Sequence, residues 1–169
     1  MAHASPFQHL ESTAGAPVPH RPERTEQALA RSEAFCRARG ARLTPIRRRV
    51  LELLHGVDRP LGAYDLVELL ASQGHRMAPI TVYRALDFLI EQGFAHRLAS
   101  RNAYIASSSL AGARTATAVL ICEACGDVSE VGSPEVAETV AKVLREVGYQ
   151  PRSRILEITG RCGHCRDDN

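Results

Sequence analysis

The chain has 169 residues and a formal net charge of +2, with 44% hydrophobic and 24% charged residues. This length suits one domain or two small ones, and the composition is that of a globular protein, which excludes collagen-like, low-complexity and wholly disordered classes. No apolar run approaches the ~20 residues that span a bilayer and no secretory signal is visible, so we expect a cytoplasmic protein without a membrane partner.

The first half of the chain predicts a set of helices followed by a hairpin. Residues 1–25 show no apolar period and are expected to form a disordered tail. Apolar spacing and helix start and stop signals predict helices at 25–38, from Thr44-Pro45 to a turn at 56–62, at 63–72 and at 79–92. Two short extended runs at 94–98 and 102–105 predict a hairpin. This order is typical of a winged helix-turn-helix domain, which we assign to residues 26–106.

The second half of the chain predicts a small unit of strands around one helix. Residues 107–116, which include three consecutive serines, are expected to form a linker. In the unit itself, residues 117–169, strands are predicted at 117–121, 128–131 and 154–159, with a helix between Ser133-Pro134 and Gly148. The apolar residues of that helix are expected to face inward: Val136, Val140, Val143, Leu144 and Val147. The expected fold class is α+β, a winged helix-turn-helix domain followed by a small α/β domain, and so small a core needs a metal or a partner subunit.

Four of the five cysteines form two pairs with the spacing of metal ligands. Cys122 and Cys125 are separated by two residues, as are Cys162 and Cys165, and 36 residues lie between the pairs. Cytoplasmic cysteines stay reduced, and two such turns together supply the tetrahedral four-sulfur set that Zn²⁺ takes. Because all four positions are sulfurs, no position stays open for water. We therefore expect a structural zinc rather than a catalytic one.

The second pair also allows a different interpretation. Cys162-Gly163-His164-Cys165 has the spacing of thiol–disulfide oxidoreductases, whose first cysteine lies at a helix N-terminus that lowers its pKa. We expect the four residues after Cys165 to be too few for a helix, and no βαβ unit surrounds the motif. Zinc is therefore favoured, and an oxidoreductase remains the alternative from another functional class.

The predicted winged helix carries the excess of positive charge. Residues 31–105 contain 12 Arg against 7 acidic residues, and a local basic excess indicates a polyanionic partner. In a winged helix-turn-helix the second helix of the pair enters the major groove, so the outward residues of the 79–92 helix would face base edges. We expect Arg84 to read guanine, whose O6 and N7 match a forked guanidinium. The other candidate DNA-binding residues are Tyr64, Thr81, Tyr83 and Arg48.

Taken together, several of these segments resemble the ferric uptake regulator family, and within it the zinc uptake regulator branch. The resemblance rests on Arg42-Leu43-Thr44-Pro45, Ala63-Tyr64-Asp65-Leu66, the run at 79–89 and Ile121-Cys122-Glu123-Ala124-Cys125-Gly126. It implies a homodimer joined through the C-terminal domain, with a winged helix on each subunit and Zn²⁺ as co-repressor. It further implies a transcriptional repressor, not an enzyme, that binds palindromic double-stranded DNA operators of zinc-uptake genes.

The resemblance also implies a second, regulatory zinc, and here the chain departs from the family pattern. His96 and Glu130 match two of its ligands, but no histidine occurs between His96 and His164. Where further ligands are expected the chain has Ser107-Ser108-Ser109 and Thr115-Ala116-Thr117, and neutral hydroxyls are poor zinc ligands. Several interpretations stay open: a sensor that recruits His75 or Cys36, a site completed by water, a regulator that needs no second zinc, a plain hydrogen-bonded pair, or a family member that senses another metal.

Overall fold

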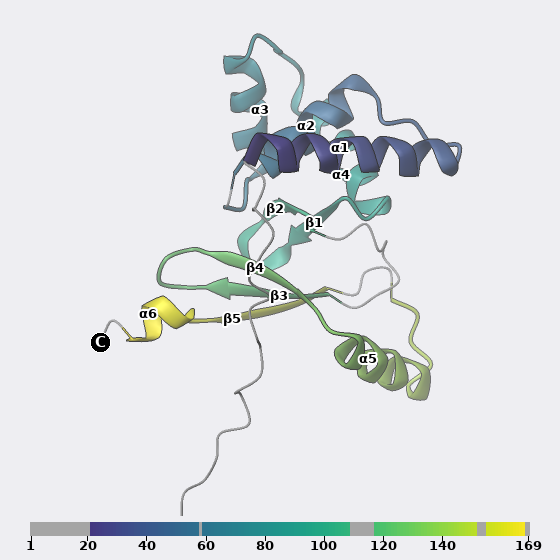
Figure 1. Cartoon of the computed structure of the whole chain (residues 1–169), viewed down its shortest axis with the longest axis vertical. Helices are drawn as coiled ribbons and strands as arrows, with labels where there is room; N and C mark the ends of the chain where they lie inside the picture. The colour runs from purple at the N-terminus through teal and green to yellow at the C-terminus, as the bar shows by residue number, and fades with distance from the viewer. Residues whose placement is uncertain (1–20, 58, 109–116, 152–154, 168–169) are drawn as a thin grey trace, which may run out of the picture.

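The computed structural model describes residues 21–57, 59–108, 117–151 and 155–167, which form two units (Figure 1). The first, which we call the head, contains α1 (Arg21–Ala38), α2 (Pro45–His55), α3 (Ala63–Ser72), α4 (Pro79–Glu91), β1 (Ala95–Leu98), the 3₁₀ turn η1 (Ala99–Arg101) and β2 (Ala103–Ala106). The second contains β3 (Thr117–Cys122), β4 (Val128–Gly132), α5 (Pro134–Glu146), β5 (Ile155–Gly160) and α6 (Gly163–Asp167). The predicted fold class is confirmed. No helix in the described ranges is long and apolar enough to cross a membrane.

One apolar core, to which all four helices contribute, holds the head together. The apolar stripes of α2, α3 and α4 turn inward, so that Leu51, Leu66 and Leu86 are fully buried. Phe94, just after α4, meets Phe35 of α1 edge-on, with 5.5 Å between the ring centroids. Gly93 has a φ of 76°, a left-handed conformation that ends α4 and turns the chain into the hairpin.

Two features of the head differ from the sequence-based prediction. α1 begins at Arg21, so residues 21–25, which we assigned to the tail, form its first turn. They contain no apolar residue, and therefore no periodicity reveals them. Within the predicted turn at 56–62, Leu61 forms an isolated antiparallel bridge with Tyr104 of β2. The Leu61 N–H donates to the Tyr104 carbonyl at 3.0 Å, and the Tyr104 N–H donates to the Leu61 carbonyl at 2.8 Å. A bridge of a single residue has no sequence period either.

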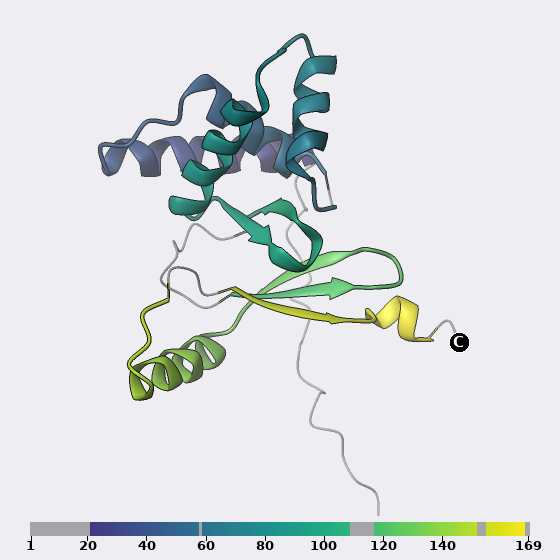
Figure 2. The same cartoon turned by 180° about the vertical axis from the view of Figure 1, so that it is seen from behind.

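The second unit is built on a three-stranded sheet of order β4-β3-β5. β3 pairs antiparallel with β4 and parallel with β5. Side chains alternate along β3, so Val119 and Ile121 are buried on one side while Leu120 points to the other and is 41% exposed. Leu98 of the hairpin is fully buried against Val119 and Ile121. The hairpin therefore lies between the helices and the sheet, as Figure 2 shows from behind, and the two units share an apolar contact.

The apolar stripe of α5 is not buried, and that prediction was wrong. No residue of α5 is buried: Val136 is 37% and Val143 is 51% exposed, and Val147, which caps the helix, is 69% exposed. Helical periodicity identifies the apolar side of a helix but not what covers it. The side of the sheet that faces away from the head is exposed as well. We call the uncovered set the apolar surface: Leu120, Val131, Val136, Val143, Val147, Leu156 and Ile158.

The burial of α4 predicts the cost of emptying its core side. We expect Leu86→Ala to lower the free energy of unfolding by about 2–5 kcal/mol, because Leu86 is fully buried and truncation leaves a cavity. The matched change Ile80→Ala on the same helix should stay within about 0.5 kcal/mol, because Ile80 is 57% exposed. Urea unfolding at one protein concentration measures both. Equal losses in the two variants would contradict this placement of α4.

Candidate metal centre and nucleic-acid interface

The two cysteine pairs meet at one end of the sheet. β3 and β5 are parallel, so their carboxyl ends lie side by side, and there Cys122 is in register with Gly160. Cys122 is the last residue of β3 and Cys125 lies in the turn after it. Cys162 follows β5, and Cys165 lies in α6. All four Sγ atoms lie within 4.8 Å of one another, and the sulfurs of Cys125 and Cys162 are 3.7 Å apart. The predicted four-cysteine cluster is therefore present.

The geometry of the cluster fits zinc. A tetrahedral ion with bonds of about 2.3 Å holds its sulfurs roughly 3.8 Å apart, and the sulfurs of Cys125 and Cys162 already lie 3.7 Å apart. The turn that carries the first pair is closed by the Gly126 N–H, which donates to the Cys122 carbonyl at 3.0 Å. The Cys162 N–H donates to the Cys122 sulfur at 3.3 Å, so the backbone of one pair supports a ligand of the other. With four protein sulfurs the site has no open position, which suits a structural ion.

The thiols of the cluster differ in acidity. Backbone N–H groups of Cys125, then of Cys162, lower the pKa of Cys122 to about 6. The neighbouring sulfurs of Cys125 and Cys162 raise the pKa of Cys165 to about 12. Four thiolates at this separation repel one another unless a cation neutralises them. The donor set is therefore one that binds a soft divalent ion by releasing protons.

A short helix begins inside the second pair, directly after Cys162, and includes Cys165, although we expected none. α6 begins at Gly163, and the Arg166 N–H donates to the Cys162 carbonyl at 2.9 Å. One such bond closes a helical turn, so five residues suffice. The oxidoreductase interpretation gains little from it, because the Cys162 sulfur faces Cys125 of the other pair rather than standing alone with Cys165.

Most of the candidate DNA-binding residues lie on the first turn of α3 and the first two turns of α4. Val82, Ala85 and Leu86 anchor α4 in the core, and this leaves Tyr83 and Arg84 exposed and Thr81 half-buried. Tyr64 at the start of α3 is 67% exposed. The first turn of α4 also exposes Ile80, an apolar side chain that was not among the residues predicted from the sequence to bind DNA.

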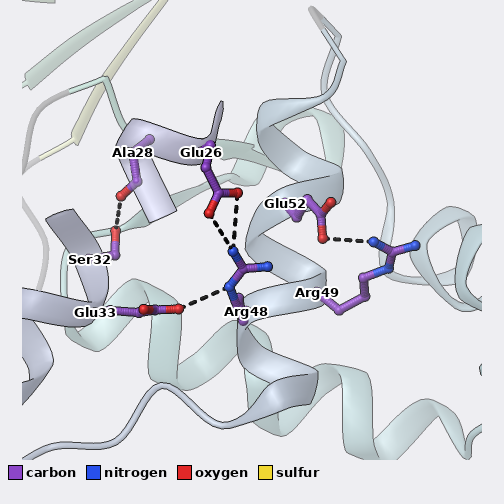
Figure 3. Close-up of polar contacts among 7 residues, drawn as sticks. All are labelled: Glu26, Ala28, Ser32, Glu33, Arg48, Arg49 and Glu52. Atoms are coloured by element: carbon purple, nitrogen blue, oxygen red, sulfur yellow. Dashed lines mark hydrogen bonds and ion pairs between the residues drawn. The ribbon is translucent and has the colours of Figure 1, made fainter. Parts of the chain in front are cut away.

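Arg48 does not join this surface. Its Nε donates to Glu33 at 2.9 Å and its Nη2 to Glu26 at 2.9 Å, so its guanidinium connects α2 to α1 (Figure 3). The neighbouring Arg49 is paired with Glu52 at 2.7 Å. The apolar period of α2 places Arg48 on the outer side of that helix. It cannot show that Glu26 and Glu33, which belong to α1, lie beside this side chain.

His96 and Glu130 do meet, across the boundary between the head and the sheet. The Nε2 of His96 lies 3.2 Å from the Oε1 of Glu130, and their side chains are only 14% and 9% exposed. Burial opposes ionisation of Glu130, but hydrogen bonds from His96 and Ser108 outweigh it and hold its pKa below the ordinary value. Within the described ranges, the four cysteines are the only group of three or more metal-ligand side chains. Neither His75 nor Cys36 completes a site with this pair.

Comparison with known proteins places these features in a family. A model of the ferric uptake regulator family matches residues 38–159. The zinc uptake regulation protein of Escherichia coli (strain K12) is 38% identical over 141 residues, which cover 83% of this chain and 82% of that protein. The protein of the same name from Mycobacterium tuberculosis (strain ATCC 25618 / H37Rv) is 30% identical over 132 residues, or 76% of this chain and 98% of that one.

Solved structures agree with the sequence relatives. A zinc uptake regulator complexed with zinc and DNA has a TM-score of 0.76 and 37% identity, over 85% of this chain and 95% of that chain. Holo XcZur has a TM-score of 0.75 at 36% identity, over 83% of this chain and 98% of its own. Apo XcZur has a TM-score of 0.50 at 35% identity, over 85% of this chain and 99% of its own. The chain therefore belongs to the ferric uptake regulator family, in its zinc uptake regulator branch.

Proposed function

We propose that this protein is a zinc-responsive, DNA-binding transcriptional repressor of zinc-uptake genes, and not an enzyme. The observation that carries the proposal is that Tyr83 and Arg84 are exposed on the side of α4 that faces away from the core. The names of similar proteins support it, since they are zinc uptake regulation proteins. One similar structure is a complex with zinc and DNA. A repressor of this kind acts in the cytoplasm, where it meets its operators.

In this proposal the first two turns of α4 enter the major groove. Arg84 would donate to O6 and N7 of a guanine, while Thr81 and Tyr83 contact phosphate or a thymine methyl group. Tyr64, from the start of α3, would reach the adjacent backbone or stack on a base. Arg48 has no part in this contact, because Glu26 and Glu33 hold its guanidinium.

Two copies of the chain would bind a palindrome through a dimer built on the apolar surface defined above. An exposed apolar patch of this extent marks an interaction site, and a two-fold axis lets the same patch cover itself. The patch lies on α5 and on the side of the sheet away from the head, so a partner there leaves both heads free. Dimerisation then supplies the cover that the valines of α5 lack within one chain.

Zinc would be held by Cys122, Cys125, Cys162 and Cys165. It supplies charge neutralisation and a cross-link between the two ends of the second unit, which binds its small core together. A second candidate function is a family member with an altered or absent regulatory metal site, or one that senses another metal. The specific observation behind it is that only His96 and Glu130 remain of a regulatory set.

Metal content tests the cysteine site. We expect about one zinc, and not iron or manganese, per chain of purified protein, and loss of that zinc in Cys162→Ser, because three thiolates bind the ion far more weakly than four. Cys36→Ala is the matched control, since Cys36 is buried in the head core outside the cluster. Plasma mass spectrometry gives the metal per chain. Full zinc occupancy in Cys162→Ser, or another metal in the wild-type protein, would refute the assignment.

Operator binding tests the proposed function itself. A duplex selected from a random library by the zinc-loaded chain should bind it more tightly with zinc than with a chelator. We expect Arg84→Ala to weaken this binding by about 1–3 kcal/mol and to relax the preference at one base pair. Arg37→Ala, which removes an exposed arginine of α1, should leave the base preference intact. Fluorescence anisotropy on a panel of single-base variants measures both. If Arg84→Ala keeps the wild-type preference at every position, Arg84 is not the reader.

The oligomeric state tests the apolar surface. Val143 is 51% exposed in the single chain, and Val143→Glu would place an unpaired charge inside the proposed dimer contact. We expect the dimer dissociation constant to rise by about 100-fold. Glu138→Lys on the opposite side of α5 should leave the dimer unchanged. Sedimentation equilibrium distinguishes the two results, and a dimer that survives Val143→Glu would require a different interface.

A further inference from the structure

Two glutamates lie at the same register position on the two outer strands of the sheet, and their side chains face the head. Glu130 on β4 and Glu157 on β5 are both in register with Val119 of β3, one from each side. Strand alternation puts them on the same side as buried Val119, against the hairpin of the head. Carboxylates at an apolar boundary are costly unless donors satisfy them.

Glu157 accepts hydrogen bonds from the turn at the tip of the hairpin. Its Oε1 accepts the Ala99 N–H at 2.6 Å, and its Oε2 accepts the Ser100 N–H at 3.1 Å and the Ser100 hydroxyl. Both N–H groups belong to η1, where no strand partner is available to them. One carboxylate thus satisfies two backbone donors and a side chain of the head.

Glu130 holds the other end of the hairpin. Its Oε1 lies 3.2 Å from His96 Nε2 and accepts the Ser107 hydroxyl at 3.4 Å, and its Oε2 accepts the Ser108 N–H at 2.6 Å. A zinc ion bound to this carboxylate would compete with these donors, and a backbone N–H cannot act as a metal ligand. The surroundings of Glu130 are therefore built from hydrogen-bond donors rather than from metal ligands.

The remaining contacts between the units need no metal. Leu98, together with Ile105, packs on Val119, Ile121 and their neighbours between the two carboxylates. The Nη2 of Arg101 donates to the Cys122 carbonyl at 3.3 Å, which joins the hairpin tip to the first cysteine turn. The head is thus connected to the sheet at both ends of the hairpin, in its middle and at the cysteine cluster.

We propose that Glu130 and Glu157 are positioning residues that dock the head on the sheet by direct hydrogen bonds, so that this chain keeps its DNA-binding arrangement with the cysteine-bound zinc alone. The docking itself does not depend on the proposed function; only its consequence for operator binding does. It follows that the response to zinc is carried by the single four-cysteine site.

Amide exchange and metal content test the docking without DNA. In the full chain with one zinc, the amides of Ala99, Ser100 and Ser108 should be protected, and Glu157→Gln should speed exchange at Ala99 and Ser100 by about tenfold, because one acceptor oxygen becomes an NH₂ group. Glu130→Gln should do the same at Ser108. Glu138→Gln, an exposed carboxylate of α5, is the matched control. Unchanged exchange in both variants overturns the proposal.

A zinc titration of the wild-type protein needs no variant to fold. Zinc beyond one equivalent should leave the metal content at one per chain and the exchange of residues 95–108 unchanged. A second bound zinc that slows this exchange, and that His96→Ala abolishes, overturns the proposal. In the DNA arm, Glu157→Gln should weaken operator binding by about tenfold at every zinc concentration. If the wild-type chain selects no duplex at all, the proposed function fails while the exchange result still decides the docking.

Discussion

Alternation of side chains across the three-stranded sheet is the constraint on which the rest of the molecule depends. It divides β3 into Val119 and Ile121 on one side and Leu120 on the other. The first side receives the hairpin of the head, and the second is exposed in the single chain, where we propose that a partner chain packs. A slip of one residue in either pairing would turn Glu130 or Glu157 away from the head. Ser129 or Val131 on β4, or Leu156 or Ile158 on β5, would then face the head instead. Register therefore determines both the docking of the head and the surface available for a dimer.

The cysteine cluster lies where it can hold that register. Because β3 and β5 are parallel and end together, the turn after one and the chain after the other meet, and four sulfurs gather within 4.8 Å. An ion bound there would join two segments far apart in the sequence and prevent β5 from sliding along β3. The Arg101 contact to the Cys122 carbonyl then connects the metal site to the tip of the hairpin. In this way a structural zinc would support the position of α4, the helix that we propose reads DNA, without touching it.

Features with a local signature were predictable from the sequence. The paired spacing of Cys122, Cys125, Cys162 and Cys165 predicted the cluster, and 3.6-residue periodicity located α2 to α5 to within about two residues at each end. Features that depend on a distant partner were not predictable. The carboxylates that hold Arg48 come from another helix, the cover of α5 is absent from the single chain, and the partner of Leu61 lies on β2.

The two glutamates that contact the head, Glu130 and Glu157, also differ in how far the sequence could predict them. His96 and Glu130 could be named from the sequence by resemblance, and the structure brings them together. Glu157 could not, since nothing local distinguishes it from any other strand glutamate. Its role follows only from the register that sets it beside Val119 and under η1.

The most direct test is an anomalous difference map at the zinc edge, from crystals of the chain bound to a selected operator duplex. We expect one zinc peak per chain, among the four cysteines, with His96 in direct contact with Glu130 and the amides of Ala99 and Ser100 on Glu157. A second peak between His96 and Glu130 would contradict a head docked by carboxylates alone.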